Sequence, residues 1–356
     1  MPATAANAHI DDQADSQEGP RATSQDAAPS RLAELLRASA DPARLGILRL
    51  LERDAFAVGE LSNVLGLGQA TISHHLKALS EAGLLTARRD GTHTFYRRAL
   101  PTPGEGAALH EALLTELDAR PLPDSHRAAR EAVYETRAAR SREFFERHGD
   151  RFDAARDLIA EPDAYLPELA ELLPESIDRC LELGPGPGEF LPTLAARAKR
   201  VVALDASSTM LERARARCAE AGIENVDFVE GDFGATTSVL GDGRQDVIVC
   251  AMVLHHVPRP EAIVSACAAA LAPGGALLVA DLCPHGQDWT RDACGDVWPG
   301  IDPDALRSWA EQSGLRRGPS QFLARRNGFR IQLQRFERPA MNHDASSAAD
   351  VAADAV

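Results

Sequence analysis

The cysteines of this chain form no recognisable binding motif. Six are spread over 356 residues, and no two of them are separated by just two residues. Zinc and redox sites are commonly built on C-x-x-C pairs, so this spacing argues against both a metal site and a disulfide framework. Cys180 and Cys250 lie in apolar runs, where cysteine usually acts as a small buried hydrophobe. We therefore expect no bound metal.

The chain also lacks a long hydrophobic run. No apolar stretch approaches the roughly 18 residues needed to cross a bilayer. Residues 1–30 have neither the basic start nor the apolar centre of a signal peptide. They are polar and acidic, which is typical of a disordered tail, and we predict a second such tail over 339–356. We expect a cytoplasmic protein with no membrane partner.

Positive charge is scarce overall but not in every part of the chain. The formal net charge is −15, which at first argues against a nucleic-acid partner. Residues 31–100, however, hold ten basic side chains against seven acidic ones. Local charge governs contact with phosphates more than the total does. A mildly basic module therefore precedes an acidic body, and 356 residues suffice for two domains.

The basic module begins with short helices around a tight turn. Apolar residues at helical spacing predict helices over 31–40, 42–51, 58–65 and 69–82. Gly66-Leu67-Gly68 separates the last two, and two helices around such a turn form a helix-turn-helix. Asp90-Gly91, flanked by alternating residues, then predicts a β-hairpin.

The helix over 69–82 has one apolar face and one polar face. Ile72, Leu76 and Leu79 would anchor it to the core. The remaining side chains suit base edges and phosphates; they are Gln69, Thr71, Ser73, His74 and Lys77. The hairpin adds Arg88 and Arg89, with Arg97 on its second arm. The alternative, a small helical bundle with a solvated hairpin, explains the order of helix, turn, helix and basic wing less well.

These residues resemble the ArsR/SmtB family of winged-helix transcriptional regulators over nearly all of 31–100. The resemblance is carried by Ala40-Asp41-Pro42-Ala43-Arg44-Leu45, Val58-Gly59-Glu60-Leu61, Thr71-Ile72-Ser73-His74-His75-Leu76-Lys77 and Arg89-Asp90-Gly91-Thr92. It implies a homodimer that reads an inverted repeat in double-stranded DNA and pairs through a helix over 105–117. The family's metal ligands have no counterpart here, and we expect His110 and Asp118 to be surface residues.

After the winged-helix module, predicted over 31–120, the pattern changes to alternating strands and helices. A helical connector is predicted over 121–141, and a charged helical run from about 125 to 148 overlaps it. From residue 179 onward, five strands alternate with helices, which predicts a mostly parallel sheet covered by helices. The predicted strands are 179–183, 200–204, 226–229, 246–250 and 276–281, and the predicted helices are 188–198, 207–221 and 260–271.

Ligand-type motifs follow four of these strands, at the sheet edge where such folds bind ligands. Glu182 precedes a loop in which Gly184, Gly186 and Gly188 alternate with prolines. The dinucleotide pattern G-x-G-x-x-G is not met, because its last position is Glu189. The motifs after the other three strands contain Asp205, the pair Asp232-Phe233, and Ala251.

Together these motifs resemble class I S-adenosylmethionine-dependent methyltransferases over about 142–338, including a hairpin around Asn327-Gly328. The resemblance implies that Glu182, Gly184, Gly186 and Gly188 hold the methionine part of the cofactor. Asp205 would then bind ribose, Asp232 and Phe233 would contact adenine, and Ala251 would lie near the sulfonium. The expected fold is a mainly-α winged helix-turn-helix followed by an α/β, Rossmann-like methyltransferase domain.

Catalysis is less well specified than cofactor binding. His255, His256, Asp281 and His285 are candidate bases by position only, and a structural role is the favoured interpretation. Two functions stay open. One is a repressor whose second domain senses S-adenosylmethionine or S-adenosylhomocysteine, as the resemblance to regulators of the methionine cycle implies. The other is an active methyltransferase of unknown acceptor with an attached winged helix.

Overall fold

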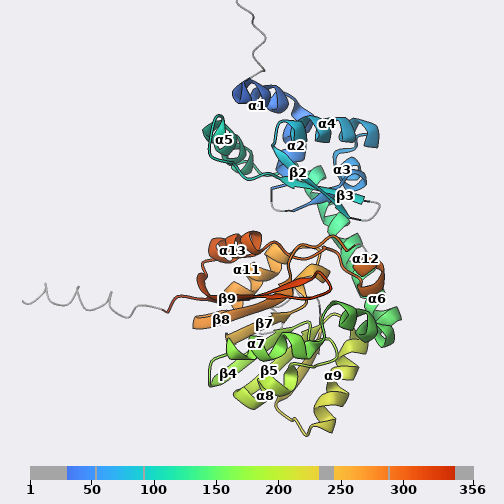
Figure 1. Ribbon diagram of the computed structural model, residues 1–356, viewed down its shortest axis with the longest axis vertical. Helices are drawn as coiled ribbons and strands as arrows, with labels where there is room; N and C mark the ends of the chain where they lie inside the picture. Colours follow the sequence, from blue (N-terminus) through green and yellow to red (C-terminus); the bar gives the residue numbers. More distant parts are fainter. Residues whose placement is uncertain (1–29, 53, 91–92, 232–243, 288, 341–356) are drawn as a thin grey trace, which may run out of the picture.

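The computed structural model describes residues 30–52, 54–90, 93–231, 244–287 and 289–340. These residues form a small helical domain and a larger sheet domain, joined by one long helix (Figure 1). The predicted multidomain fold is confirmed. Among the described helices, none is both long and apolar enough to span a membrane.

The helical domain is a winged helix. Its elements are α1 (Arg31–Ser39), α2 (Pro42–Leu50), β1 (Phe56–Ala57), α3 (Val58–Leu65), α4 (Gln69–Glu81), β2 (Leu85–Asp90), β3 (His93–Arg98) and α5 (Ala107–Asp118). Asp41 caps α2 by accepting a hydrogen bond from the Arg44 amide, with Pro42 at the first helical position. Gly66 ends α3 in the left-handed conformation, which sets the turn into α4. The three strands pair in the order β1-β3-β2.

The connecting helix, α6 (Asp124–Ile159), is longer than the sequence predicts. A helix ending near His148 is expected because glycine follows it, and glycine costs about 1 kcal/mol within a helix. The helix instead continues through Gly149, and beyond it Phe152 and Ile159 are buried in the core of the sheet domain. Tertiary burial therefore outweighs the local cost, and the predicted border at 141/142 lies inside one continuous helix.

The sheet domain has seven strands in the order β6-β5-β4-β7-β8-β10-β9. Strands β6 (Val226–Glu230), β5 (Ala198–Asp205), β4 (Ile177–Leu183), β7 (Gln245–Ala251) and β8 (Leu271–Leu282) are parallel. The hairpin of β9 (Arg316–Ala324) and β10 (Arg330–Glu337) joins β8 in antiparallel fashion. The helical elements are η1 (Pro162–Ala164), α7 (Leu166–Glu171), α8 (Leu191–Arg197), α9 (Ser208–Glu220), η3 (Leu254–His256), α11 (Pro260–Ala270), α12 (Trp289–Cys294) and α13 (Pro303–Gln312).

Two apolar clusters cover the two faces of this sheet, because parallel strands are buried on both sides. The strand and helix order predicted from the sequence is confirmed, with boundaries that differ by a few residues. Among the strands the largest difference is β8, which begins at Leu271 and not at residue 276.

The two domains meet where the wing, the hairpin of β2 and β3, lies against residues 285–302 of the sheet domain (Figure 1). Arg88 donates hydrogen bonds to the carbonyl oxygens of His285 and Pro299, the latter at 3.1 Å. Arg97 forms an ion pair with Asp302 at 3.5 Å. The wing is therefore part of the domain interface.

Candidate functional site

A pocket of the sheet domain lies at the carboxyl ends of β4, β5 and β7. Its cavity volume is about 110 Å³, and it is partly open to solvent. Residues following each of these three strands form its wall. The opposite wall comes from α6, through Ser141, Arg142, Phe145, Phe152 and Arg156. The connecting helix is thus also a wall of the candidate site.

The glycine loop after β4 depends on backbone conformations that favour glycine. Gly184, Gly186 and Gly188 all have positive φ, between 54° and 80°. A β-carbon on Gly184 would lie 2.3 Å from the Val253 side chain. A β-carbon on Gly186 would meet nothing within 4 Å, because this residue faces the pocket. The loop therefore leaves open backbone at the position where a ligand can approach it.

Two buried carboxyl groups, Glu182 and Asp205, stand at the tips of adjacent strands. Burial raises the pKa of Glu182 to about 8, with a further contribution from the charge of Asp205. Burial also raises the pKa of Asp205 to about 6, although the amides of Ser207 and Gly186 donate hydrogen bonds to it at 2.9 and 3.3 Å. Among the described residues, Oε2 of Glu182 has no hydrogen-bond partner. A cationic or hydroxyl-bearing ligand would satisfy both acids.

The structure brings together most of the residues that the sequence predicts for this site. Five of them line the pocket, namely Glu182, Gly184, Gly186, Asp205 and Ala251. Gly188 lies behind the loop, where its β-carbon position is 3.0 Å from the Ala214 backbone; its role is close packing of the loop on α9. Asp232 and Phe233 lie outside the described residues.

Sequence reasoning missed the contribution of α6 and of the turn after β7. Nothing in a charged helical run marks Phe145 or Arg156 as pocket residues, since their position depends on where the helix packs. Met252 adopts a φ of 55°, the one positive value among the described non-glycine residues. Such a conformation costs about 1–3 kcal/mol and is often found at functional sites. It can be recognised only from the structure.

The second candidate surface is the outward face of α4. Ile72, Leu76 and Leu79 are fully buried, as the sequence predicts. The five polar residues of the predicted DNA-binding face are all exposed: Gln69, Thr71, Ser73, His74 and Lys77. Lys77 also pairs with Glu81 at 3.7 Å, an exposed contact of small energetic value. The polar face of α4 is therefore accessible at all five positions.

Arg88 and Arg89, the two wing residues predicted to contact DNA, lie in different surroundings. Arg89 is exposed, whereas Arg88 is half-buried and donates to carbonyl oxygens of the sheet domain. The structure therefore does not place Arg88 beside Arg89 on the solvent side. The cause is the packing of the wing on residues 285–302, which no local pattern in the hairpin indicates.

Three other histidines, His110, His255 and His285, are buried. His110 is 4% exposed, which corrects the expectation of a surface residue, and burial lowers its pKa. Asp118 is more exposed but bonds Arg98 at 2.9 Å. His285 packs against Phe329 with ring centroids 4.7 Å apart. His256 lines the pocket, and burial together with the charge of His255 lowers its pKa well below the usual value.

Comparison with known proteins agrees with both halves of this description. Residues 41–87 match the family model of bacterial regulatory proteins of the arsR family, and residues 180–275 match that of a methyltransferase domain. Both resemblances inferred from the sequence are confirmed. The methyltransferase match also confirms the predicted cofactor class, S-adenosylmethionine or S-adenosylhomocysteine.

The curated relatives share only the second half of the chain. The ubiquinone biosynthesis O-methyltransferase of Escherichia coli O127:H6 is 29% identical over 151 residues, which are 39% of this chain and 62% of that protein. The corresponding enzyme of Shigella boydii has the same values. The chain therefore spans less than two thirds of the length of these relatives.

Solved structures of similar fold include methyltransferases and the [4+2]-cyclase SpnF. The N-methyltransferase NodS of Bradyrhizobium japonicum, with S-adenosyl-L-homocysteine, is 19% identical and covers 53% of this chain and 98% of that one (TM-score 0.41). The magnesium protoporphyrin IX methyltransferase of Synechocystis, with bound S-adenosylmethionine, is 19% identical and covers 57% and 97% (TM-score 0.43).

Proposed function

We propose that this chain is a DNA-binding transcriptional repressor whose methyltransferase-like domain binds S-adenosylmethionine or S-adenosylhomocysteine as an effector. From the family resemblance, the predicted targets are genes of the methionine cycle. The single observation that carries the proposal is α6. Its N-terminal half supplies Val133 and Tyr134 to the winged-helix core, and its C-terminal half walls the pocket.

The pocket suits the adenosyl ligand. The unpartnered oxygen of Glu182 would accept from the ammonium group of the methionine part, and the open backbone at Gly186 leaves room beside it. Asp205, at the adjacent strand tip, would accept from the ribose hydroxyls. Asp232 and Phe233 remain proposed adenine contacts. These groups are shared by both ligands, which differ by one methyl group at sulfur.

Helix α4 would bind in the major groove of the DNA. Its exposed polar residues would face the duplex: Gln69, Thr71, Ser73, His74 and Lys77. A homodimer would present two such helices to an inverted repeat. Leu32 and Leu36 on α1 are 43% and 51% exposed, and α1 packs beside α5. This apolar surface supports pairing through α1 and α5, the helices that flank the helix-turn-helix.

Ligand binding and DNA binding would be coupled through α6, a rigid helix that contacts one domain at each end. A ligand that binds only one arrangement of α6 shifts the population toward that arrangement, and so changes DNA affinity. The wing adds a second link, because Arg88 donates to carbonyl oxygens of the sheet domain and the exposed Arg97 pairs with Asp302. Moving the sheet domain would therefore change which cations of the wing can reach phosphate.

The test begins with an operator selected by the full chain from a random DNA pool. Fluorescence anisotropy then gives the DNA affinity across a titration of each adenosyl ligand. We expect a change of about tenfold or more, equivalent to about 1.4 kcal/mol of coupling. DNA affinity that stays constant under saturating concentrations of both ligands, with binding confirmed by calorimetry, would refute the regulator.

The second candidate function is an active methyltransferase. It is favoured by the similarity to O-methyltransferases and by His256, a neutral imidazole in the pocket wall that could accept a proton from an acceptor hydroxyl. Transfer of labelled methyl groups into small-molecule or macromolecular extracts tests it. A protein that binds S-adenosylmethionine but transfers no label would refute the methyltransferase hypothesis.

A further inference from the structure

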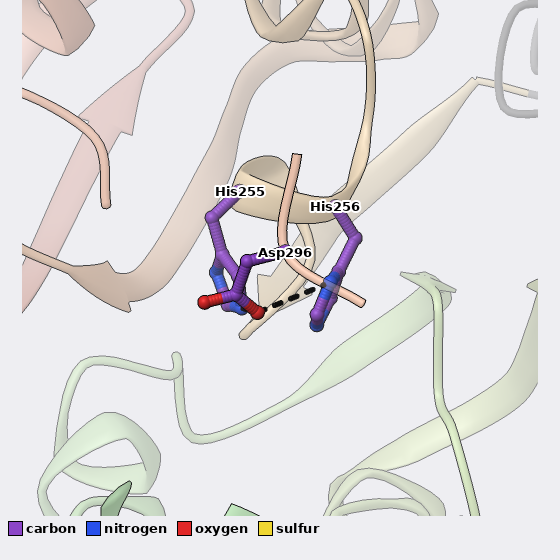
Figure 2. A group of neighbouring side chains, drawn as sticks. All are labelled: His255, His256 and Asp296. Carbon is purple, nitrogen blue, oxygen red and sulfur yellow. Dashed lines mark ion pairs between the residues drawn. The ribbon is translucent and has the colours of Figure 1, made fainter. Parts of the chain in front are cut away.

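Three buried side chains converge beside the cofactor pocket. His255 and His256 come from η3, and Asp296 comes from the loop after α12 (Figure 2). Oδ1 of Asp296 lies 3.7 Å from Nε2 of His255 and 3.6 Å from Nδ1 of His256. The same Nδ1 also lies 3.4 Å from the carbonyl oxygen of Gly295, a long contact that an ion would replace. One ligand atom of each residue falls within 4.8 Å of the other two. We call these residues the His-His-Asp cluster.

Asp296 is left without hydrogen bonds in this environment. Its side chain is 2% exposed, and among the described residues no donor meets normal hydrogen-bond geometry with either oxygen, although the burial that raises its pKa is partly opposed by the nearby Thr290 hydroxyl. A buried carboxylate without donors is costly, so such a group usually pairs with a cation or coordinates a metal. The nearest charged partner is His255, at a distance longer than a direct hydrogen bond.

The orientation of His255 is fixed from behind by a second carboxylate. Nδ1 of His255 lies 2.7 Å from Oδ1 of Asp281, and Asp281 is itself held by the amides of Leu254 and Leu282 at 2.9 and 2.8 Å. A proton on Nδ1 directs the lone pair of Nε2 toward Asp296. Metal-binding histidines are commonly oriented in this way, by a carboxylate on the nitrogen that does not face the metal.

The geometry points to a binding site for one divalent transition-metal ion, of the zinc class, held by Nε2 of His255, Nδ1 of His256 and a carboxylate oxygen of Asp296. Ligands about 2.1 Å from a tetrahedral zinc ion lie about 3.4 Å apart, close to the two nitrogen–oxygen separations of 3.6 and 3.7 Å. Two imidazoles and one carboxylate favour this class over calcium or magnesium. This site departs from the expectation that no metal binds.

The cluster lies between two cavities of the molecule. The ion would have access from two sides, because His256 lines the cofactor pocket and Asp296 lines a separate cavity between the domains.

An ion here would fix the segment on which the wing rests. The amides of Val297 and Trp298 both donate to the carbonyl oxygen of His255 at 2.9 Å. Trp298 in turn packs against Phe95 of the wing, with ring centroids 6.2 Å apart. Coordination of Asp296 by the same ion as His255 would add a direct tie between η3 and this segment.

The test uses the full chain without a polyhistidine tag, stripped with a chelator and then titrated with Co²⁺ and Zn²⁺. We expect one ion per chain by elemental analysis, and visible absorption bands of cobalt bound to nitrogen and oxygen ligands. Asp296→Asn and His256→Gln should each weaken zinc binding about 100-fold, judged by calorimetry. His285→Gln, a buried histidine outside the cluster, is the matched control and should bind as the parent does.

Either of two results would overturn the site. One is a parent chain that takes up no stoichiometric ion, in which case a protonated His255 between two carboxylates accounts for the cluster. The other is uptake that is equal in Asp296→Asn, His256→Gln and the control, which would place the ion elsewhere. Circular dichroism and thermal unfolding of each variant establish that the chain is folded, and the parent titration decides independently of any variant.

Discussion

The two halves of α6 have opposite surroundings. In the N-terminal half, Arg137 donates to both oxygens of Glu60 at 2.8 and 2.6 Å and lies over the ring of Trp298 at 4.7 Å. In the C-terminal half, the helix faces a pocket in which Glu182 keeps an unpartnered oxygen. We call the first half the completed end, because Arg137 pairs with Glu60 within the chain even though its Nη1 has no hydrogen-bond partner among the described residues. We call the second half the open end, because polar groups of its pocket need a ligand.

This difference shows at which end of α6 a substitution changes stability and at which end it changes ligand affinity. At the completed end, contacts are made within the chain, so a change there alters stability. At the open end, contacts are supplied from outside, so a change there alters ligand affinity. A signal would pass from the second end to the first only if the helix moves as one body.

The largest expected effect is at the open end. Asp205→Ala removes the acceptor proposed for the ribose and the anchor of the Gly186 and Ser207 amides. Hydrogen bonds to charged groups contribute about 1.5–3 kcal/mol each, so affinity for S-adenosylhomocysteine should fall at least about 100-fold by calorimetry. DNA affinity without ligand should stay unchanged. Asp227→Ala, an exposed acid paired with Arg200, is the control, and an equal loss there would contradict the assignment.

At the completed end, Arg137→Ala should act on stability. It leaves the Glu60 carboxylate without its partner and removes the cation from Trp298. Breaking such a largely buried pair costs about 3 kcal/mol, to be measured by urea unfolding. The control is Arg140→Ala, an exposed arginine one turn along the same helix. Equal destabilisation by both variants would mean that the contacts of Arg137 are not specific.

A third prediction concerns pH at the open end. The raised pKa of Glu182, about 8, means that it binds a proton in the folded, ligand-free chain below that pH. Stability without ligand should therefore rise as pH falls from 8 toward 4.5, because the folded chain holds a proton that the unfolded chain does not. Binding of an ammonium-bearing ligand should weaken about twentyfold from pH 8.5 to pH 6.5.

Glu182→Gln is the control for this pH effect. It keeps the shape of the side chain but removes the titration, so most of the pH dependence of binding should disappear. Calorimetry at four or five pH values on both proteins would decide. A parent whose affinity does not change across this range would contradict the proposed contact with the ammonium group.

The smallest effect is expected at the wing. Arg89 is exposed, so Arg89→Gln should weaken DNA binding about threefold and lower the dependence of affinity on salt. Arg88 is bound to carbonyl oxygens of the sheet domain, so Arg88→Gln should change the response to ligand more than basal DNA affinity. If both variants lose DNA affinity equally, the wing must leave the sheet domain when DNA binds.

Much of the fold could be predicted from the sequence because its signals are local. The apolar spacing of Ile72, Leu76 and Leu79 orients α4, and the glycine loop with Asp205 locates the pocket edge. The length of α6 could not be predicted, since Gly149 locally favours an end that distant packing overrides. The His-His-Asp cluster also escaped prediction, because Asp296 lies 40 residues from His256 and carries no motif.

The sequence by itself determined the two modules, their order, and the strand tips that carry Glu182 and Asp205. Helical and strand periodicity, caps and glycine conformations act over a few residues, and so they can be read along the chain. Only the tertiary structure decided that α6 belongs to both domains, and that the wing arginines divide between solvent and interface. Those outcomes depend on which buried surfaces meet, and the free energy of such contacts is not encoded in any local pattern.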